Sequence, residues 1–157
     1  MREATLCFLI KEINGERELL LAMKKQGFGE GRWNGVGGKF DSKNDKNIIA
    51  TAKRELKEEI GVISQEIKKV VILSFYFPYQ KDWNQNVHVF FVANWQGEPK
   101  ETEEVRPKWF KINEIPLDKM WPDDKFWLPR VLNGEKLKAE FVFKPGELID
   151  SYEIKTV

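Results

Sequence analysis

The sequence predicts an α/β fold in which a mixed β-sheet is sandwiched between α-helices. Two observations predict it: β-favouring apolar runs lie on both sides of an amphipathic helical segment, and a second helical segment precedes a final hairpin pattern. The length of 157 residues suits one domain over residues 1–157 with a real hydrophobic core.

The first elements are a β-hairpin and a long loop. Residues 5–10 and 18–23 are apolar and β-favouring, and Asn14-Gly15 between them is typical of a tight hairpin turn. Residues 26–45 are rich in Gly and Asn without periodicity, which predicts a loop whose backbone amides can approach a ligand. A loop of this length in a compact domain is usually functional.

A helix is expected from about Asp45, a candidate N-cap, to Glu59, with Gly61 ending it. Its apolar positions recur with helical spacing and predict the buried face: Ile48, Ile49, Ala52, Leu56 and Ile60. Glu55 and Glu59 border this stripe, so both are expected at the junction between helix and sheet.

The second half of the chain predicts further strands, a helix and a hairpin. In order, these are strands at 70–77 and 86–94, a short strand or turn at 109–110, a helix at 123–132, and strands at 141–143 and 148–154 around a Pro-Gly turn. This order of elements favours a sheet between helices.

Charge and cysteine content exclude several classes of protein. The 26 basic and 25 acidic side chains nearly cancel, so the chain lacks the positive field that binds long nucleic acids. The single cysteine, Cys7, excludes an internal disulfide and favours a reducing compartment. The apolar stretch at residues 6–10 is too short for a signal peptide or a membrane span. We therefore expect a cytoplasmic monomer without a membrane partner.

The segment 54–62, Arg-Glu-Leu-Lys-Glu-Glu-Ile-Gly-Val, carries the strongest functional signal. Glu55, Glu58 and Glu59 have the i, i+3, i+4 spacing that places side chains on one helix face. Three like charges there cost stability unless a cation is bound, and carboxylate ligands suit Mg²⁺ or Mn²⁺. The alternative is an ordinary solvated helix face. The glycine turn upstream and the Gly-Val stop downstream favour the metal site.

This segment fits the R-E-U-x-E-E-x-G-U half of the Nudix box, where U is a bulky aliphatic residue. The chain thus resembles a Nudix hydrolase, which cleaves a nucleoside diphosphate linked to another group, and the resemblance implies the Nudix fold and a role for Arg54 in holding a carboxylate in place. One departure is visible: the interval from Gly38 to Arg54 is two residues longer than in the family, and Lys46 stands where the family has a glutamate. Asp41 or Asp45 is expected to substitute for that glutamate.

Four further segments are similar to one branch of this family, the MutT-homologue branch of oxidised purine nucleoside triphosphatases that removes 8-oxo-dGTP from the nucleotide pool. They are residues 23–39, 87–90, 104–110 and 120–124. Glycines at 35, 37 and 38 permit a tight turn beside the acidic helix, so that a carbonyl there can complete a metal shell. The resemblance implies that the Gly37 carbonyl and Glu104 are metal ligands together with Glu55, Glu58 and Glu59. Taken alone, Glu104 would be surface charge.

Base recognition needs a flat apolar slot with a few polar groups. Phe28, Phe75, Phe77 and Trp121 can supply the slot, with Trp121 as the stacking plate. Core packing is the alternative for Phe75 and Phe77.

The polar groups expected around this slot come from separate segments. Asn34 offers an amide donor and acceptor, and Asp123 and Asp124 offer acceptors that gain a donor when protonated. The alternative for the acidic pair is a helix cap. Lys24 is expected near the base or the triphosphate, with solvation as the alternative. Cys7 is a candidate for contact with the base pocket, and a packed thiol is the default interpretation.

The predicted activity is a Mg²⁺-dependent pyrophosphohydrolase that converts oxidised purine nucleoside triphosphates, such as 8-oxo-dGTP and 2-hydroxy-dATP, to the monophosphate and pyrophosphate. Glu59 is the first choice for base or principal ligand, and Glu104 is the competing base. Two alternatives stay open. One is a Nudix hydrolase of methylated purine nucleotides, canonical dNTPs or dinucleoside polyphosphates, and the other is a catalytically idle Nudix nucleotide-binding module.

Overall fold

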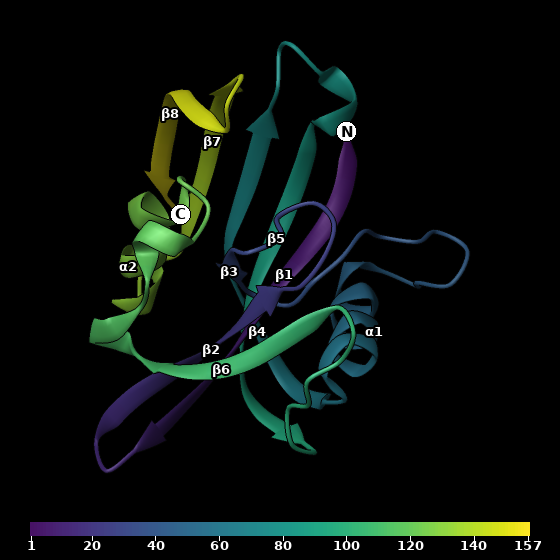
Figure 1. Ribbon diagram of the computed structural model, residues 1–157, viewed down its shortest axis with the longest axis vertical. Helices are drawn as coiled ribbons and strands as arrows, with labels where there is room; N and C mark the ends of the chain where they lie inside the picture. Colours follow the sequence, from purple (N-terminus) through teal and green to yellow (C-terminus); the bar gives the residue numbers. More distant parts are fainter.

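Eight strands form a mixed sheet in the order β3-β2-β1-β5-β4-β7-β8, with β6 paired to β2 (Figure 1). The computed structural model describes residues 1–157. The strands are β1 (Arg2–Ile13), β2 (Glu16–Lys24), β3 (Trp33–Asn34), β4 (Ile63–Tyr76), β5 (Gln85–Gln96), β6 (Val105–Lys111), β7 (Leu137–Lys144) and β8 (Leu148–Thr156). Short 3₁₀ helices cover Lys81–Trp83, Ile112–Glu114 and Leu117–Lys119. The pairs β1–β5 and β4–β7 are parallel and the others antiparallel, so the expected mixed sheet is confirmed.

Strand β1 joins the two parts of this sheet. Its residues 2–9 pair with β5, and its residues 10–13 pair with β2 across the Asn14-Gly15 turn. The predicted hairpin is therefore confirmed. Strand β2 pairs with β1 at residues 16–19, with β3 at residues 22–23 and with β6 along residues 18–24.

Helix α1 (Ile48–Ile60) begins later than expected. Its N-cap is Asn47, whose side chain accepts a backbone hydrogen bond from the first turn at 2.9 Å, so the expectation that Asp45 caps the helix is wrong. Asp45 is too far upstream and accepts the Thr51 hydroxyl instead, at 2.8 Å. Gly61 ends the helix as predicted, with a φ of 72° that glycine adopts without strain.

The buried face of α1 differs from the predicted stripe at one position. Ala52, Leu56 and Ile60 are fully buried, whereas Ile49 is 44 % exposed. Thr51 is buried in the first part of the helix, where its hydroxyl bonds to Asp45. A polar contact therefore closes this end of the helix, where an apolar contact was expected.

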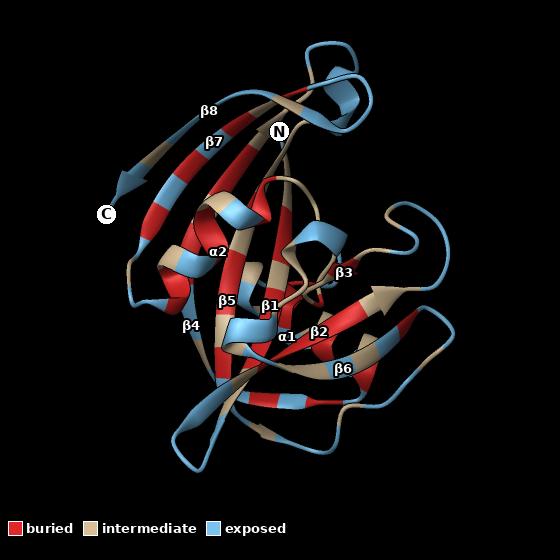
Figure 2. Cartoon of the chain, turned by 60° about the vertical axis from the view of Figure 1, so that its left-hand side comes forward, coloured by how far each residue is buried: buried red, intermediate tan, exposed pale blue.

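Helices α1 and α2 (Asp124–Leu132) pack into different hydrophobic clusters on the two faces of the sheet. Cys7 and Leu9 of β1 pack with α1, and Phe8 between them packs with α2, as the alternation of side chains along a strand requires. Figure 2 shows buried positions running along the central strands β1 and β5. The helices on both sides of the sheet are thus confirmed. No helix is long and apolar enough to cross a membrane.

The glycine-rich segment 26–45 is not wholly the loop that was predicted, because it contains strand β3 and because part of it lies along β1. Val36 and Cys7 exchange two backbone hydrogen bonds, of 2.6 and 2.9 Å, and the Gly38 carbonyl accepts the Thr5 N–H at 2.9 Å. A Cβ atom on Gly37 would lie 1.9 Å from the Thr5 carbonyl oxygen. Only glycine allows this approach, which fixes the turn to the central strand.

We expect Gly37→Ala to destabilise the protein by about 3 kcal/mol or more, because the added methyl group cannot fit against the β1 backbone. Gly15→Ala is the matched control: its Cβ would meet nothing within 4 Å, and its φ of 80° adds only conformational strain, about 1–2 kcal/mol. Urea unfolding of both variants checks the difference. Equal losses of stability would contradict the proposed contact.

Candidate active site

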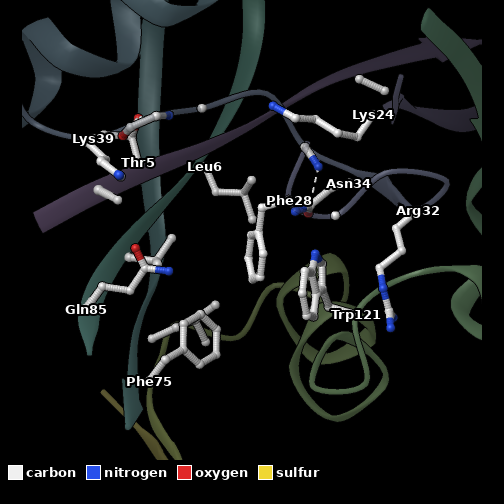
Figure 3. A pocket seen from close by; sticks show the side chains of 18 of the residues that line it. Thr5, Leu6, Lys24, Phe28, Arg32, Asn34, Lys39, Phe75, Gln85 and Trp121 are labelled. Carbon is white, nitrogen blue, oxygen red and sulfur yellow. Dashed lines mark hydrogen bonds between the residues drawn. The ribbon is translucent and has the colours of Figure 1, made fainter. Parts of the chain in front are cut away.

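A cavity of about 400 Å³ lies between β1, the glycine turn and the start of α2 (Figure 3). It brings together residues that are far apart in the sequence. Those expected there from the sequence are Lys24, Phe28, Asn34, Gly37, Glu59, Phe75, Phe77, Trp121, Asp123 and Asp124. One cavity therefore holds both the candidate base-binding groups and one of the candidate catalytic carboxylates.

The aromatic slot forms at one end of this cavity. The Phe28 ring lies 5.1 Å from Trp121, at an angle of 32°, on a glycine-flanked loop that leaves Phe28 68 % exposed. Phe77 stacks on Phe143 at 5.1 Å, and Phe75 packs edge-on against the same ring at 5.7 Å. Phe75 and Phe77 thus line the cavity and also pack against the core, so both interpretations of these residues hold.

Asn34 is held in one orientation. Its side-chain oxygen accepts the Gly35 N–H at 2.8 Å, while its amide nitrogen has no hydrogen-bond partner in the protein. The side chain therefore presents an N–H donor for an acceptor on a bound ligand.

Asp123 and Asp124 are almost completely buried, with 3 and 2 % exposure. Asp123 Oδ2 accepts the Trp127 indole N–H at 2.8 Å, whereas Asp124 Oδ2 is buried without a partner. Asp123 occupies the N-cap position of α2 but bonds to no backbone N–H, so the alternative of a simple helix cap is wrong. Its side chain is directed to Trp127.

Burial raises the pKa of both carboxyls in this pair. The pKa of Asp124 is raised well above its ordinary value, by burial first and by the adjacent Asp123 charge second. The pair therefore retains a proton at a pH where exposed aspartates are ionised. A protonated carboxyl can donate a hydrogen bond and its ionised neighbour can accept one.

The acidic helix edge is organised by Arg54. Its Nε and Nη2 donate to the two oxygens of Asp45, both at 2.8 Å. This contact holds the pKa of Asp45 well below its usual range. Hydrogen bonds from the Asp41 backbone and from Thr51 lower the pKa further, by smaller amounts. Asp45 thus provides the carboxylate that Lys46 cannot, and Lys46 itself is exposed.

Two motif carboxylates also contact Arg54. Its Nη1 donates to Glu55 at 2.9 Å and to Glu58 at 3.2 Å. The Glu55 side chain is 14 % exposed and abuts Gly38, where a Cβ atom would lie 2.4 Å from the carboxylate. The Glu58 side chain is 59 % exposed and lies outside the cavity. Arg54 therefore holds carboxylates in place, as the family resemblance implied.

Glu59 carries an excess of negative charge around it. Its pKa is raised to about 8 by burial first, then by Glu55, with Glu104 adding to the rise and Lys24 opposing it. Glu104 is exposed, just before β6. No three acidic side chains are arranged as a closed coordination shell. The expected ligands therefore lie near one another, but their side chains do not surround a single metal position.

The backbone beside this cluster offers a further oxygen. The carbonyls of Val36 and Gly38 accept hydrogen bonds from β1, whereas the Gly37 carbonyl between them accepts none. An unpaired carbonyl and several crowded carboxylates are the donors that a hard divalent cation prefers. The residues present therefore fit the metal ion that the motif implies.

Cys7 does not reach the base pocket, and the default interpretation of a packed thiol is confirmed. It is 1 % exposed, packs in the cluster beneath α1 and does not line the cavity. The alternation of side chains along β1 turns it to the helix side of the sheet. Burial raises the pKa of its thiol, with Glu55 and Glu59 adding to the effect, so it is a packed neutral thiol.

Other residues line the cavity without having been predicted. They are chiefly Thr5, Leu6, Arg32, Lys39 and Gln85 (Figure 3). Gln85 begins β5 in alternation with the cavity residue Val87, which is a signal that strand periodicity could have provided. Arg32 has no such local signal, because its partners are distant in the sequence.

Comparison with known proteins identifies the family of this chain. The NUDIX domain model matches residues 2–131. An oxidized purine nucleoside triphosphate hydrolase of Mus musculus is 41 % identical over 90 % of this chain and 88 % of its own length, and its counterpart in Danio rerio is 38 % identical over 88 and 87 %. The crystal structure of a MutT protein from Bacillus halodurans superposes with a TM-score of 0.82 at 25 % identity, covering 99 % of this chain and 98 % of that one. The chain therefore belongs to the Nudix family.

Proposed function

We propose that this protein is a Mg²⁺-dependent pyrophosphohydrolase that converts oxidised purine nucleoside triphosphates, including 8-oxo-dGTP and 2-hydroxy-dATP, to the monophosphate and pyrophosphate. The observation that carries the proposal is one cavity with a buried Asp123–Asp124 pair at its aromatic end and Glu59 at its acidic end. The relatives at 38–41 % identity are named for the same activity. The proposed enzyme is a cytoplasmic monomer, with one domain over residues 1–157.

At the aromatic end, the purine stacks on the Trp121 face that the Phe28 ring covers, and the exposed Phe28 side chain moves aside to admit it. Asn34 donates to an acceptor on the base, because its oxygen is already bonded to Gly35. The Asp123–Asp124 pair supplies one donor and one acceptor, and moving the shared proton lets it meet purines whose edges differ.

At the acidic end, Glu55, Glu59, Glu104 and the Gly37 carbonyl are the proposed metal ligands, with Glu58 at the exposed margin. Nudix hydrolases use a divalent cation, and the bound ion would neutralise phosphate charge and lower the pKa of water. Glu59 acts as ligand or base, and Glu104 is the other candidate base. Lys24 adds a positive charge beside Glu59, where a triphosphate would lie.

The rival activities differ in substrate or in the absence of turnover. Methylated purine nucleotides, canonical dNTPs and dinucleoside polyphosphates would all reach the same acidic edge, so the base end decides among them. Pyrophosphate release from normal, oxidised and methylated dNTPs, together with nucleotide release from dinucleoside polyphosphates, each with Mg²⁺ or with EDTA, separates these cases. No hydrolysis of any of these nucleotides would identify an idle binding module.

We expect Glu59→Gln to leave the fold intact and to lower turnover about 100-fold or more, because it removes a charge from the metal site without changing side-chain size. Glu103→Gln, at an exposed neighbour of Glu104, is the control and should be silent. Steady-state hydrolysis of 8-oxo-dGTP is the measurement. Near-normal turnover in a well-folded Glu59→Gln protein would reassign the site.

We expect Asp123→Asn to change affinity unequally for 8-oxo-dGTP and 2-hydroxy-dATP, because an amide fixes the hydrogen-bonding pattern that the acidic pair can exchange. Dissociation constants from about pH 5 to 9, in a Glu59→Gln background that blocks turnover, check this. Exposed Asp118 provides the control variant Asp118→Asn.

The same variant should change the pH dependence of folding. The buried pair keeps a proton that the unfolded chain releases above about pH 4, so it makes the free energy of unfolding fall as the pH rises. Asp123→Asn should reduce that fall. Equal losses for both ligands, with unchanged pH profiles, would leave Asp123 as a packing residue only.

A further inference from the structure

Trp121 is held between two different partners. Phe28 lies on one side of its ring and Arg32 on the other (Figure 3). The Arg32 guanidinium carbon is 4.5 Å from the Trp121 ring centroid, and Arg32 Nη1 donates to the Met120 carbonyl at 2.9 Å. Arg32 therefore contacts both the ring of the stacking plate and the backbone that carries it.

Arg32 is itself held by the C-terminal hairpin. Its Nη2 forms an ion pair with Glu147, in the turn between β7 and β8. Glu147 lies beyond residues 2–131, the part of the chain that matches the NUDIX domain model. A segment outside that match thus reaches the base end of the cavity in two ways, through Phe143, which lines it, and through the contact of Glu147 with Arg32.

The Arg32 charge also acts on the acidic pair. It lowers the pKa of both Asp123 and Asp124, against the larger effect of burial. The pair faces Arg32 from the loop before β3 and the Trp127 indole from α2. Because the Arg32 guanidinium stacks on the Trp121 ring and also lies near the acidic pair, it can hold Trp121 and the pair in one arrangement.

We propose that Arg32 is a positioning residue of the base pocket, that it fixes Trp121 from the side opposite Phe28, and that Glu147 anchors it there. The turn at Glu147 thereby contributes to nucleotide affinity through Arg32, in addition to the direct lining of the cavity by Phe143 of the same hairpin. The effect on affinity rests on the proposed function, whereas the effect on Trp121 does not.

An ordinary surface ion pair would behave differently. The side chains of Arg32 and Glu147 are 29 and 45 % exposed, and exposed ion pairs contribute little to stability. Arg130 and Glu135 form a matched pair, with bonds of 2.8 and 2.9 Å, that does not line the cavity. Arg130→Met is therefore the control for loss of an arginine ion pair alone.

The test compares Arg32→Met, Arg32→Lys and Glu147→Gln with Arg130→Met in the full-length protein. The first readout is the NMR signal of the Trp121 indole N–H, assigned by its loss in Trp121→Phe, without any ligand. We expect Arg32→Met and Glu147→Gln to shift or broaden this signal and Arg130→Met to leave it unchanged. An unmoved signal in both test variants would overturn the proposal even if the substrate were different.

The second readout is steady-state hydrolysis of 8-oxo-dGTP. Arg32→Met should raise KM about five- to tenfold, as loss of a contact worth roughly 1 kcal/mol implies, and kcat should stay within about twofold because the change is remote from Glu59. Glu147→Gln should raise KM less, and should add nothing in the Arg32→Met background.

Arg32→Lys keeps the charge but loses the planar group that stacks on Trp121 and the paired N–H donors of the guanidinium, so its KM should stay raised. Wild-type KM in Arg32→Lys, or independent effects of Arg32→Met and Glu147→Gln, would refute the positioning role. Absence of hydrolysis by the wild-type protein would instead count against the proposed function. In that case the indole signal still decides the role of Arg32.

Discussion

The bidentate contact between Arg54 and Asp45 is the interaction on which the acidic edge of this protein depends. Asp45 is buried and accepts hydrogen bonds from two nitrogens of Arg54. The third nitrogen of Arg54 donates to Glu55 and Glu58. Arg54 Nη2 also reaches the Lys39 carbonyl at 3.3 Å, so one guanidinium joins the helix to the glycine turn. Removing either partner would leave a charge without compensation, which is costly in a buried setting. The carboxylates that would bind a cation are thus kept close together despite their repulsion.

Strand β1 connects this acidic edge to the base pocket. Its backbone near Thr5 and Cys7 bonds to the glycine turn, while Thr5 and Leu6 line the cavity. The central strand therefore lines the cavity between the two ends of the site. This arrangement explains why Gly37 has no room for a side chain and why its carbonyl is left unpaired.

Local sequence signals predicted most of the fold and the acidic edge. The Asn14-Gly15 turn, the Gly61 stop and the spacing of Glu55, Glu58 and Glu59 are all short-range features, and the structure keeps them. The helix start was predicted wrongly because Asp45 and Asn47 are both good capping residues, and only the tertiary contact with Arg54 assigns Asp45 another task. The contact between Arg54 and Asp45 also supplies a carboxylate near Lys46, the position where the family has a glutamate.

Long-range contacts could not be predicted in this way. The pairing of Val36 with Cys7 and the contact of Arg32 with Glu147, 115 residues away, depend on the folded sheet. The pocket role considered for Cys7 was wrong because strand alternation predicts which residues share a face of the sheet, but not which face borders the cavity. The sequence left Phe75 and Phe77 between a core role and a pocket role. Both roles hold, because the cavity wall is also the surface of the core.

We infer that Arg54 and Asp45 arrange the carboxylates for a divalent cation. Calorimetric titration of the metal-free protein with Mg²⁺ tests it most directly, in the wild type, in Asp45→Asn and in the control Asp41→Asn, whose side chain accepts hydrogen bonds from Lys43 and Asn44 and none from Arg54. We expect Asp45→Asn to weaken Mg²⁺ binding about tenfold or more, as loss of a residue that orients metal ligands does, and Asp41→Asn to bind as the wild type does. Equal Mg²⁺ affinity in all three folded proteins would contradict the account.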